Sequence, residues 1–61
     1  MMTTPHLLRE IDAAAYLGLA PKTLARWRWA GKGPAFHKLG SAVRYSVLEL
    51  DSFISNAAVA P

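Results

Sequence analysis

Apolar positions early in the chain follow the spacing of a short helix. Ala14 and Leu17 lie three residues apart within the segment 10–17, and Ala13 lies beside them, so all three fall on one side of a helix. Gly18 follows, and glycine readily adopts the left-handed conformation found at helix C-termini. We therefore expect a helix from residue 10 or 11 to residue 17, with this side facing the core.

A second helix is predicted from Pro21 to about Ala30. Proline suits the first helical position because its missing N–H group would have no partner there, and Gly31 is placed to close the helix. Ala20 takes the N-cap position, where a Ser, Thr or Asp would add roughly 1 kcal/mol of stability. Only residues 18–20 separate the two helices, and a three-residue turn with glycine is typical of helix-turn-helix units.

Glycine and proline within residues 31–34 end the helical pattern, and a β-hairpin is predicted beyond them. The runs 35–39 and 42–45 have the composition of strands, and Gly40 and Ser41 between them fit a type II′ turn. That turn sets a register with three facing pairs, which are Phe36 with Tyr45, His37 with Arg44, and Lys38 with Val43.

The last segment predicts a third helix. Ser46 and Glu49 have the spacing of a capping box, in which each side chain bonds the other's backbone N–H group. Apolar residues then recur at helical spacing and are expected to form a buried stripe, which comprises Val47, Leu50, Phe53, Ile54 and Ala57.

The order helix, helix, hairpin, helix defines a winged helix-turn-helix fold, mainly α with a small β-hairpin. The length of 61 residues allows one domain, spanning residues 1–61, with 1–6 and 58–61 expected to fray. Leu7 and Leu8 could pack back onto the core. The larger side chains expected in the core are Trp27, Phe36, Val43 and Tyr45.

Positive charge is concentrated in the middle of the chain. Six of the seven Lys and Arg residues lie between positions 20 and 45, where no Asp or Glu occurs, whereas the two flanks together are acidic. The net charge is +3. Such segregation favours a polyanionic partner, most often nucleic acid, although a solvated basic face would look the same. Both the predicted second helix and the hairpin fall within the basic segment, which favours double-stranded DNA.

The second helix should present a basic face to solvent. With Leu24 and Trp27 facing inward, Lys22, Arg26 and Trp29 point outward at about 100° per residue. Early residues of a recognition helix meet base edges, so Arg26 is expected to pair with guanine and Lys22 to meet phosphate. Trp29 should be exposed, and it would contact the DNA backbone, the hairpin or a protein partner.

Further DNA contacts are expected beside that face and on the hairpin. Thr23 lies in the first turn of the second helix, and Arg28 lies on its flank. Arg28 would either contact DNA or pair with Asp12 or Glu49. The hairpin, or wing, offers Lys38, Ser41 and Arg44.

Catalysis is not expected from this set of residues. There is no cysteine, and the two histidines, His6 and His37, do not combine with acids at metal-ligand spacing. We therefore expect no enzyme, no metal, no cofactor and no small-molecule ligand. Neither a signal sequence nor an apolar run of about 20 residues occurs, so we expect no membrane contact and a cytoplasmic location.

Several segments, in order, resemble the helix-turn-helix domains of phage excisionases and AlpA-type regulators. They are DAAAYLGL (12–19), PKTL (21–24), RW (26–27), GKGP (31–34), KLG (38–40), VRY (43–45) and LDSF (50–53). The resemblance implies a MerR-like winged helix that binds DNA through Lys22, Thr23, Arg26 and Arg28 and through the wing residues Lys38, Ser41 and Arg44. Glu10, Ala20 and Trp29 depart from the family pattern.

Excision is the function that we favour from this resemblance. An excisionase, or recombination directionality factor, binds and bends attachment-site DNA and helps a tyrosine integrase, with adjacent copies of itself as further partners. A small AlpA-type transcriptional regulator is the alternative, and a protein-interaction module for an acidic partner is a second one. One unit of this size reads few base pairs, so each role on DNA requires several sites, bending or a partner.

Overall fold

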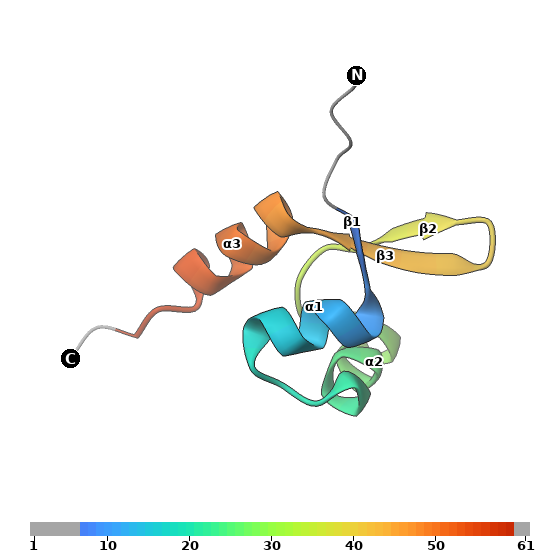
Figure 1. The fold of residues 1–61 in the computed structure, drawn as a ribbon. Helices are drawn as coiled ribbons and strands as arrows, with labels where there is room; N and C mark the ends of the chain where they lie inside the picture. The colour runs from blue at the N-terminus through green and yellow to red at the C-terminus, as the bar shows by residue number, and fades with distance from the viewer. Residues whose placement is uncertain (1–6, 60–61) are drawn as a thin grey trace, which may run out of the picture.

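A computed structural model describes residues 7–59, which form three helices and one three-stranded sheet (Figure 1). The elements in chain order are β1 (Leu7–Arg9), α1 (Glu10–Leu17), α2 (Pro21–Ala30), β2 (His37–Leu39), β3 (Ala42–Ser46) and α3 (Val47–Asn56). The predicted helix-helix-hairpin-helix order and the winged helix-turn-helix class are confirmed. The arm predicted to fray, residues 1–6, lies outside the described residues.

The turn between α1 and α2 follows the prediction. Gly18 has a φ of 73°, and the N–H groups of Gly18 and Leu19 donate to the carbonyls of Ala15 and Ala14 at 3.1 and 2.8 Å. Both helix boundaries at this turn match the expected ones. Ala20 is the N-cap of α2 and makes no side-chain hydrogen bond, because it has no oxygen to accept one.

A strand that the sequence pattern did not predict completes the sheet. β1 pairs antiparallel with β3, with Leu8 opposite Tyr45, so the sheet order is β1-β3-β2. Three residues are too few for an alternating pattern to show, which is why sequence reasoning went no further than packing Leu8 on the core. The third strand makes β3 central, and Tyr45 is buried there.

The hairpin has the predicted turn and register. His37 faces Arg44 and Lys38 faces Val43, while Gly40 has a φ of 66°. Ser41 has no positive φ, so the turn is of type II′ and not type I′. β2 begins at residue 37 rather than 35, so Phe36 precedes the ladder, although its ring still lies 6.2 Å from that of Tyr45.

The core is small and lies where α1, α2, β3 and α3 meet. Its fully buried apolar members are Ala13, Ala14, Leu24, Tyr45 and Leu50, and Leu8, Leu17, Trp27 and Val43 pack around them. The two alanines let α1 approach its neighbours closely. Phe36, expected in this core, is 40% exposed, because it stands before β2 at the margin of the sheet.

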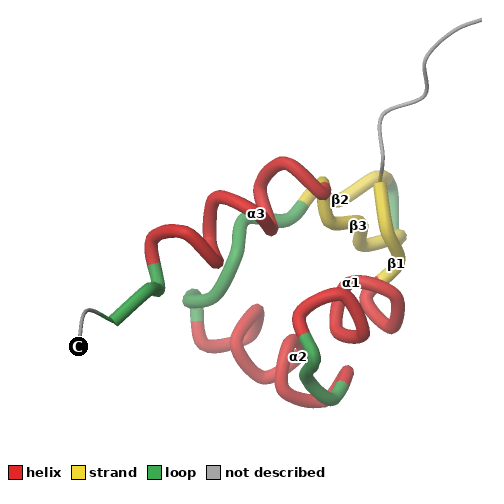
Figure 2. The backbone as a smooth tube through the Cα atoms, turned by 60° about the vertical axis from the view of Figure 1, so that its left-hand side comes forward, coloured by secondary structure: helices red, strands yellow, loops and turns green. Residues whose placement is uncertain are grey.

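α3 departs from its prediction in two respects. Ser46 is its N-cap but makes no side-chain cap bond, so the capping box does not form, and Glu49 instead contacts His37. The expected buried stripe is shorter than predicted, since Ile54 is 47% exposed and Ala57 lies beyond the helix end. In Figure 2 the C-terminal end of α3 extends away from the sheet, and in this half of the helix Phe53 packs on Trp27 of α2 whereas Ile54 is exposed. No helix within residues 7–59 is long and apolar enough to cross a bilayer.

Candidate nucleic-acid interface

The outer face of α2 carries the predicted basic residues. Leu24 is buried in the core and Trp27 packs on Phe53, with ring centroids 5.8 Å apart, so the opposite side of the helix faces solvent. Lys22, Arg26 and Trp29 are all exposed there. Thr23 is half-buried at the first turn. The predicted inward and outward sides of α2 are therefore the observed ones.

Trp27 is held against α3 by the loop that follows α2. A Cβ atom at Gly33 would lie 2.9 Å from Trp27 Cε3, and Gly33 has a φ of 92°. Any side chain at this position would push the loop off the indole and strain the backbone. Gly33 thus allows the loop to lie directly against the Trp27 indole.

Every acidic residue accepts a hydrogen bond within the described part of the chain. Asp12 pairs with Arg9 at 2.9 Å, Glu49 lies 2.7 Å from His37 Nε2, and Asp51 accepts from the Tyr16 hydroxyl. The bond to Asp51 raises the pKa of Tyr16 above its ordinary value. The fourth acid, Glu10, has the most partners and is described next.

Glu10 joins three elements at one carboxylate. Its Oε2 accepts from Arg28 Nε at 3.1 Å and from the Tyr45 hydroxyl at 3.0 Å, and its Oε1 accepts from Arg28 Nη2 at 3.3 Å. Arg28 therefore has an acidic partner, but the expected partners Asp12 and Glu49 were wrong. Sequence reasoning missed Glu10 because only the sheet position of Tyr45 brings α1, α2 and β3 together here.

The environment of this carboxylate shifts two titrations. The hydrogen bond to Glu10 raises the pKa of Arg28 further above its ordinary value, so the guanidinium stays charged. Burial, and then the bond to Glu10, raise the pKa of Tyr45. Through its bonds to Arg28 and to Tyr45, Glu10 connects α2 to β3, the central strand of the sheet, so these two elements have a defined relative position.

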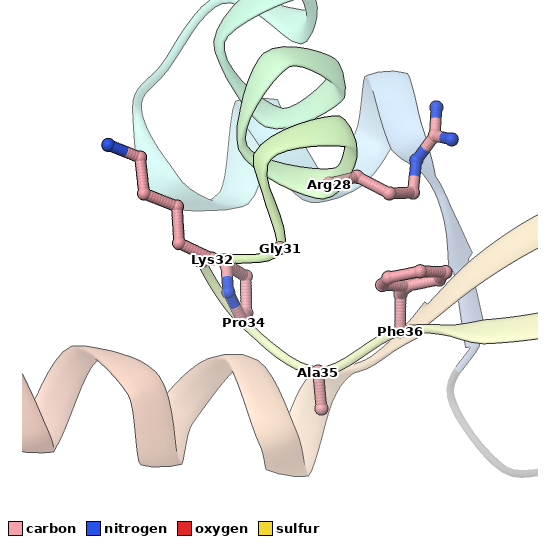
Figure 3. A pocket seen from close by; sticks show the side chains of 7 residues that line it. Arg28, Gly31, Lys32, Pro34, Ala35 and Phe36 are labelled. Atoms are coloured by element: carbon pink, nitrogen blue, oxygen red, sulfur yellow. The ribbon is translucent and has the colours of Figure 1, made fainter.

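Arg28 also lies between two aromatic rings. Its guanidinium carbon is 6.0 Å from the centroid of Trp29 and 5.9 Å from that of Phe36, within the range of cation–π contacts. Figure 3 shows Arg28 and Phe36 on one side of an open hollow of about 350 Å³, with Lys32 pointing away on the other side. No group of side chains within residues 7–59 has the composition of a metal site.

The hairpin exposes Lys38 and Ser41, while Arg44 is half-buried. Arg44 donates from Nη1 to the carbonyl of Val43 at 2.8 Å. In the sheet, Arg44 lies between Arg9 on β1 and His37 on β2. Both neighbours have acidic partners, so Arg44 is the residue of this row without one. Arg9 was not among the expected site residues because β1 was not foreseen.

Several cations therefore remain available to a partner. Within residues 7–59, Lys22, Arg26, Lys32 and Lys38 make no ion pair or side-chain hydrogen bond, whereas all the acids are engaged. The unpaired charge on this surface is therefore positive. It lies on α2, on the loop that follows α2 and on the wing. Such a surface suits the phosphates of a nucleic acid.

The comparison with known families agrees with this geometry. The model of the helix-turn-helix domain family, which includes AlpA- and excisionase-like proteins, matches residues 7–58, nearly all of the described chain. The chain therefore belongs to the helix-turn-helix domain family and is a DNA-binding helix-turn-helix domain. No curated protein matches the chain.

Proposed function

We propose that this domain is an excisionase, a recombination directionality factor that binds and bends attachment-site DNA and helps a tyrosine integrase excise a mobile element. In this proposal the outer face of α2 enters the major groove, and the wing residues Lys38, Ser41 and Arg44 contact the flanking backbone. The observation that carries it is the separation of charge, since the acids are held by internal partners while Lys22 and Arg26 stand free on one helix face.

A single helix-turn-helix unit fits a role in which several proteins act together on one stretch of DNA. A single module buries about 600–1,000 Å² of its surface on DNA and reads few base pairs, which is too little to select one site in a genome. In this proposal the remaining selectivity comes from adjacent sites, from the bend, or from a partner on the same DNA. An excisive complex provides all three, because attachment-site arms carry clustered sites and an integrase.

The test combines footprinting with an excision assay on the attachment-site DNA and integrase encoded with this chain. We expect protected sites on one arm, a bend in circular-permutation gels, and excision that depends on the protein. The double variant Lys22→Glu, Arg26→Glu should abolish all three, whereas Ser52→Ala on α3 should retain them.

The remaining roles give different results in the same experiment. Protection at promoters without any stimulation of excision would contradict the excisionase and identify an AlpA-type regulator. With Lys22, Lys38 and Arg44 each contacting one phosphate, the slope of log Kobs against log salt should be about −2.7. A slope near zero would instead indicate a module for an acidic protein.

A further inference from the structure

A large aromatic side chain extends the basic face of α2. Trp29 is 83% exposed, and it lies seven residues after Lys22 and three after Arg26. Seven residues are close to two helical turns, so Trp29 lies almost in line with Lys22, about 10 Å further along the helix axis. Lys22, Arg26 and Trp29 thus form one row, which we call the α2 row.

The fold does not require an indole at this position. Trp27, two residues earlier, supplies the aromatic contact to α3 through Phe53, and no buried residue depends on Trp29. The ring does have a support, because the Arg28 guanidinium lies 6.0 Å from its centroid and is itself held by Glu10. An exposed aromatic side chain of this size, in contact with a guanidinium that is itself held in place, is a feature of binding surfaces.

We propose that Trp29 contacts DNA directly, with its indole packed on an apolar surface of the duplex at the edge of the major groove. This inference rests on the proposed placement of α2 in that groove. The α2 row covers about 10 Å, or roughly three base pairs at about 3.4 Å each, so Lys22 and Trp29 meet different base pairs. The apolar groups within reach there are the thymine methyl and the deoxyribose beside it.

Charge identifies DNA as the occupant of this surface. α2 carries no acid, and the residues nearest the indole in the row and beside it are Arg26 and Arg28. An apolar protein surface docking on Trp29 would have to bury Arg26 without a partner, which is costly. A duplex offers an apolar patch for the indole and phosphates for the cations within the same footprint.

Affinity and its salt dependence distinguish this contact from a general basic surface. The probe is the duplex that the wild-type protein binds best in a selection from a random library. Trp29→Ala should weaken binding about tenfold and leave the salt slope unchanged, because an apolar contact releases no counterions. Lys22→Ala should reduce the slope by about one. Leu48→Ala removes an apolar side chain that is 80% exposed on α3, and it should change neither quantity.

Two further measurements locate the contact. In the Trp27→Phe variant the remaining indole fluorescence reports Trp29 alone, and it should change on addition of the duplex. Replacing thymines by uracil one position at a time removes single methyl groups. If one position weakens wild-type binding but not that of Trp29→Ala, the methyl is the contact. If no position matters while Trp29→Ala still binds weakly, the contact is the deoxyribose.

The proposal is overturned if Trp29→Ala binds the duplex with wild-type affinity and the fluorescence does not respond. In that case, loss of integrase binding by the same variant would assign the indole to a protein partner. The placement of α2 is tested separately, since Lys22→Ala and Arg26→Ala would then still weaken DNA binding. If those two variants also bind normally, both the groove placement and the contact by Trp29 are wrong.

Discussion

α2 and α3 are helices of equal length with opposite surfaces. Each spans ten residues, each begins after an N-cap residue without a side-chain bond, and each places one leucine, Leu24 or Leu50, fully in the core. α2 carries three cations and no acid, whereas α3 carries two acids and no cation. The two helices therefore bury the same kind of side chain in the core but carry charges of opposite sign on their surfaces.

The difference lies in what the charged residues contact. Both acids of α3 have partners on other elements, since Glu49 contacts His37 on β2 and Asp51 contacts Tyr16 on α1. On α2 only Arg28 is used in this way, through Glu10, while Lys22 and Arg26 have no partner within residues 7–59. The polar side of α3 thus holds the fold together, and the polar side of α2 is free to bind DNA.

Truncating the buried leucine of either helix should cause the largest loss of stability, and the loss should be similar for α2 and α3. Leu24→Ala and Leu50→Ala should each lower the free energy of unfolding by about 2–5 kcal/mol, as for other buried leucines. A domain of this size has a total of only several kcal/mol, so both variants should be largely unfolded at 37 °C. Thermal and urea unfolding provide the measurement. The comparison fails if Leu50→Ala costs as little as the exposed control Leu48→Ala.

The free cations should show the sharpest contrast between the two helices. Arg26→Ala should remove about 1–3 kcal/mol of discrimination at one base pair, because a bidentate contact to guanine is lost. Lys38→Ala on the wing should lower affinity uniformly across sequences and reduce the salt slope by about one. Binding to a panel of duplexes with single substitutions measures both. Equal and small effects would count against placing α2 in the groove, and Ser52→Ala on α3 serves as the unaffected control.

Tyr45 and Tyr16 each donate a hydrogen bond to an acidic residue on a helix, and the two bonds should contribute differently to the free energy of unfolding. Tyr45→Phe removes a buried hydroxyl that donates to the carboxylate holding Arg28, and we expect a loss of about 1.5 kcal/mol at neutral pH. Tyr16→Phe removes the bond to Asp51, but the Tyr16 side chain is 47% exposed, so its loss should be smaller. Chemical unfolding of both variants provides the comparison, and a larger loss for Tyr16→Phe would reverse it.

The dependence of stability on alkaline pH tests the role of Tyr45 in a second way. The pKa of Tyr45 is raised in the folded state, so above a pH of about 10 the unfolded chain loses a proton that the folded chain keeps. The contribution of Tyr45 to stability should therefore be constant below that pH and should fall as the pH rises from there toward the folded-state pKa. Unfolding followed between neutral and alkaline pH should show a shallower fall in Tyr45→Phe than in the wild type. An identical fall would exclude Tyr45 as its source.

The two N-caps should show the smallest effects, in opposite directions. Ala20→Ser provides the missing acceptor at the start of α2 and should add up to about 1 kcal/mol of stability. Ser46→Ala at the start of α3 removes a hydroxyl that makes no cap bond, so it should cost only a few tenths of a kcal/mol, below the usual loss for a cap. Thermal unfolding resolves the two. A full cap-sized loss for Ser46→Ala would show that the hydroxyl does cap α3.

Much of the fold was predictable from local sequence signals. Gly18, Pro21, Gly31 and the Gly40-Ser41 turn act through their own backbone preferences, and the helix boundaries and hairpin register they predict are those observed. The outward face of α2 was predictable for a similar reason, since helical periodicity alone separates Leu24 and Trp27 from Lys22, Arg26 and Trp29.

Contacts between distant residues were not predictable in this way. β1 is too short to show an alternating pattern, and the length of the buried stripe on α3 depends on where the core ends. The capping box at Ser46 was a local expectation that a tertiary contact overrode, because Glu49 reaches His37 on the neighbouring strand.

The amino-acid sequence by itself determined the elements, their order and the excess of positive charge between residues 20 and 45, because backbone preference and charge belong to individual residues. Only the tertiary structure decided which charges remain free. Glu10 was one acid among four until β3 brought Tyr45 beside it, 35 residues later, and α2 brought Arg28. Pairing of this kind depends on distances in space, and those distances exist only once the core has formed.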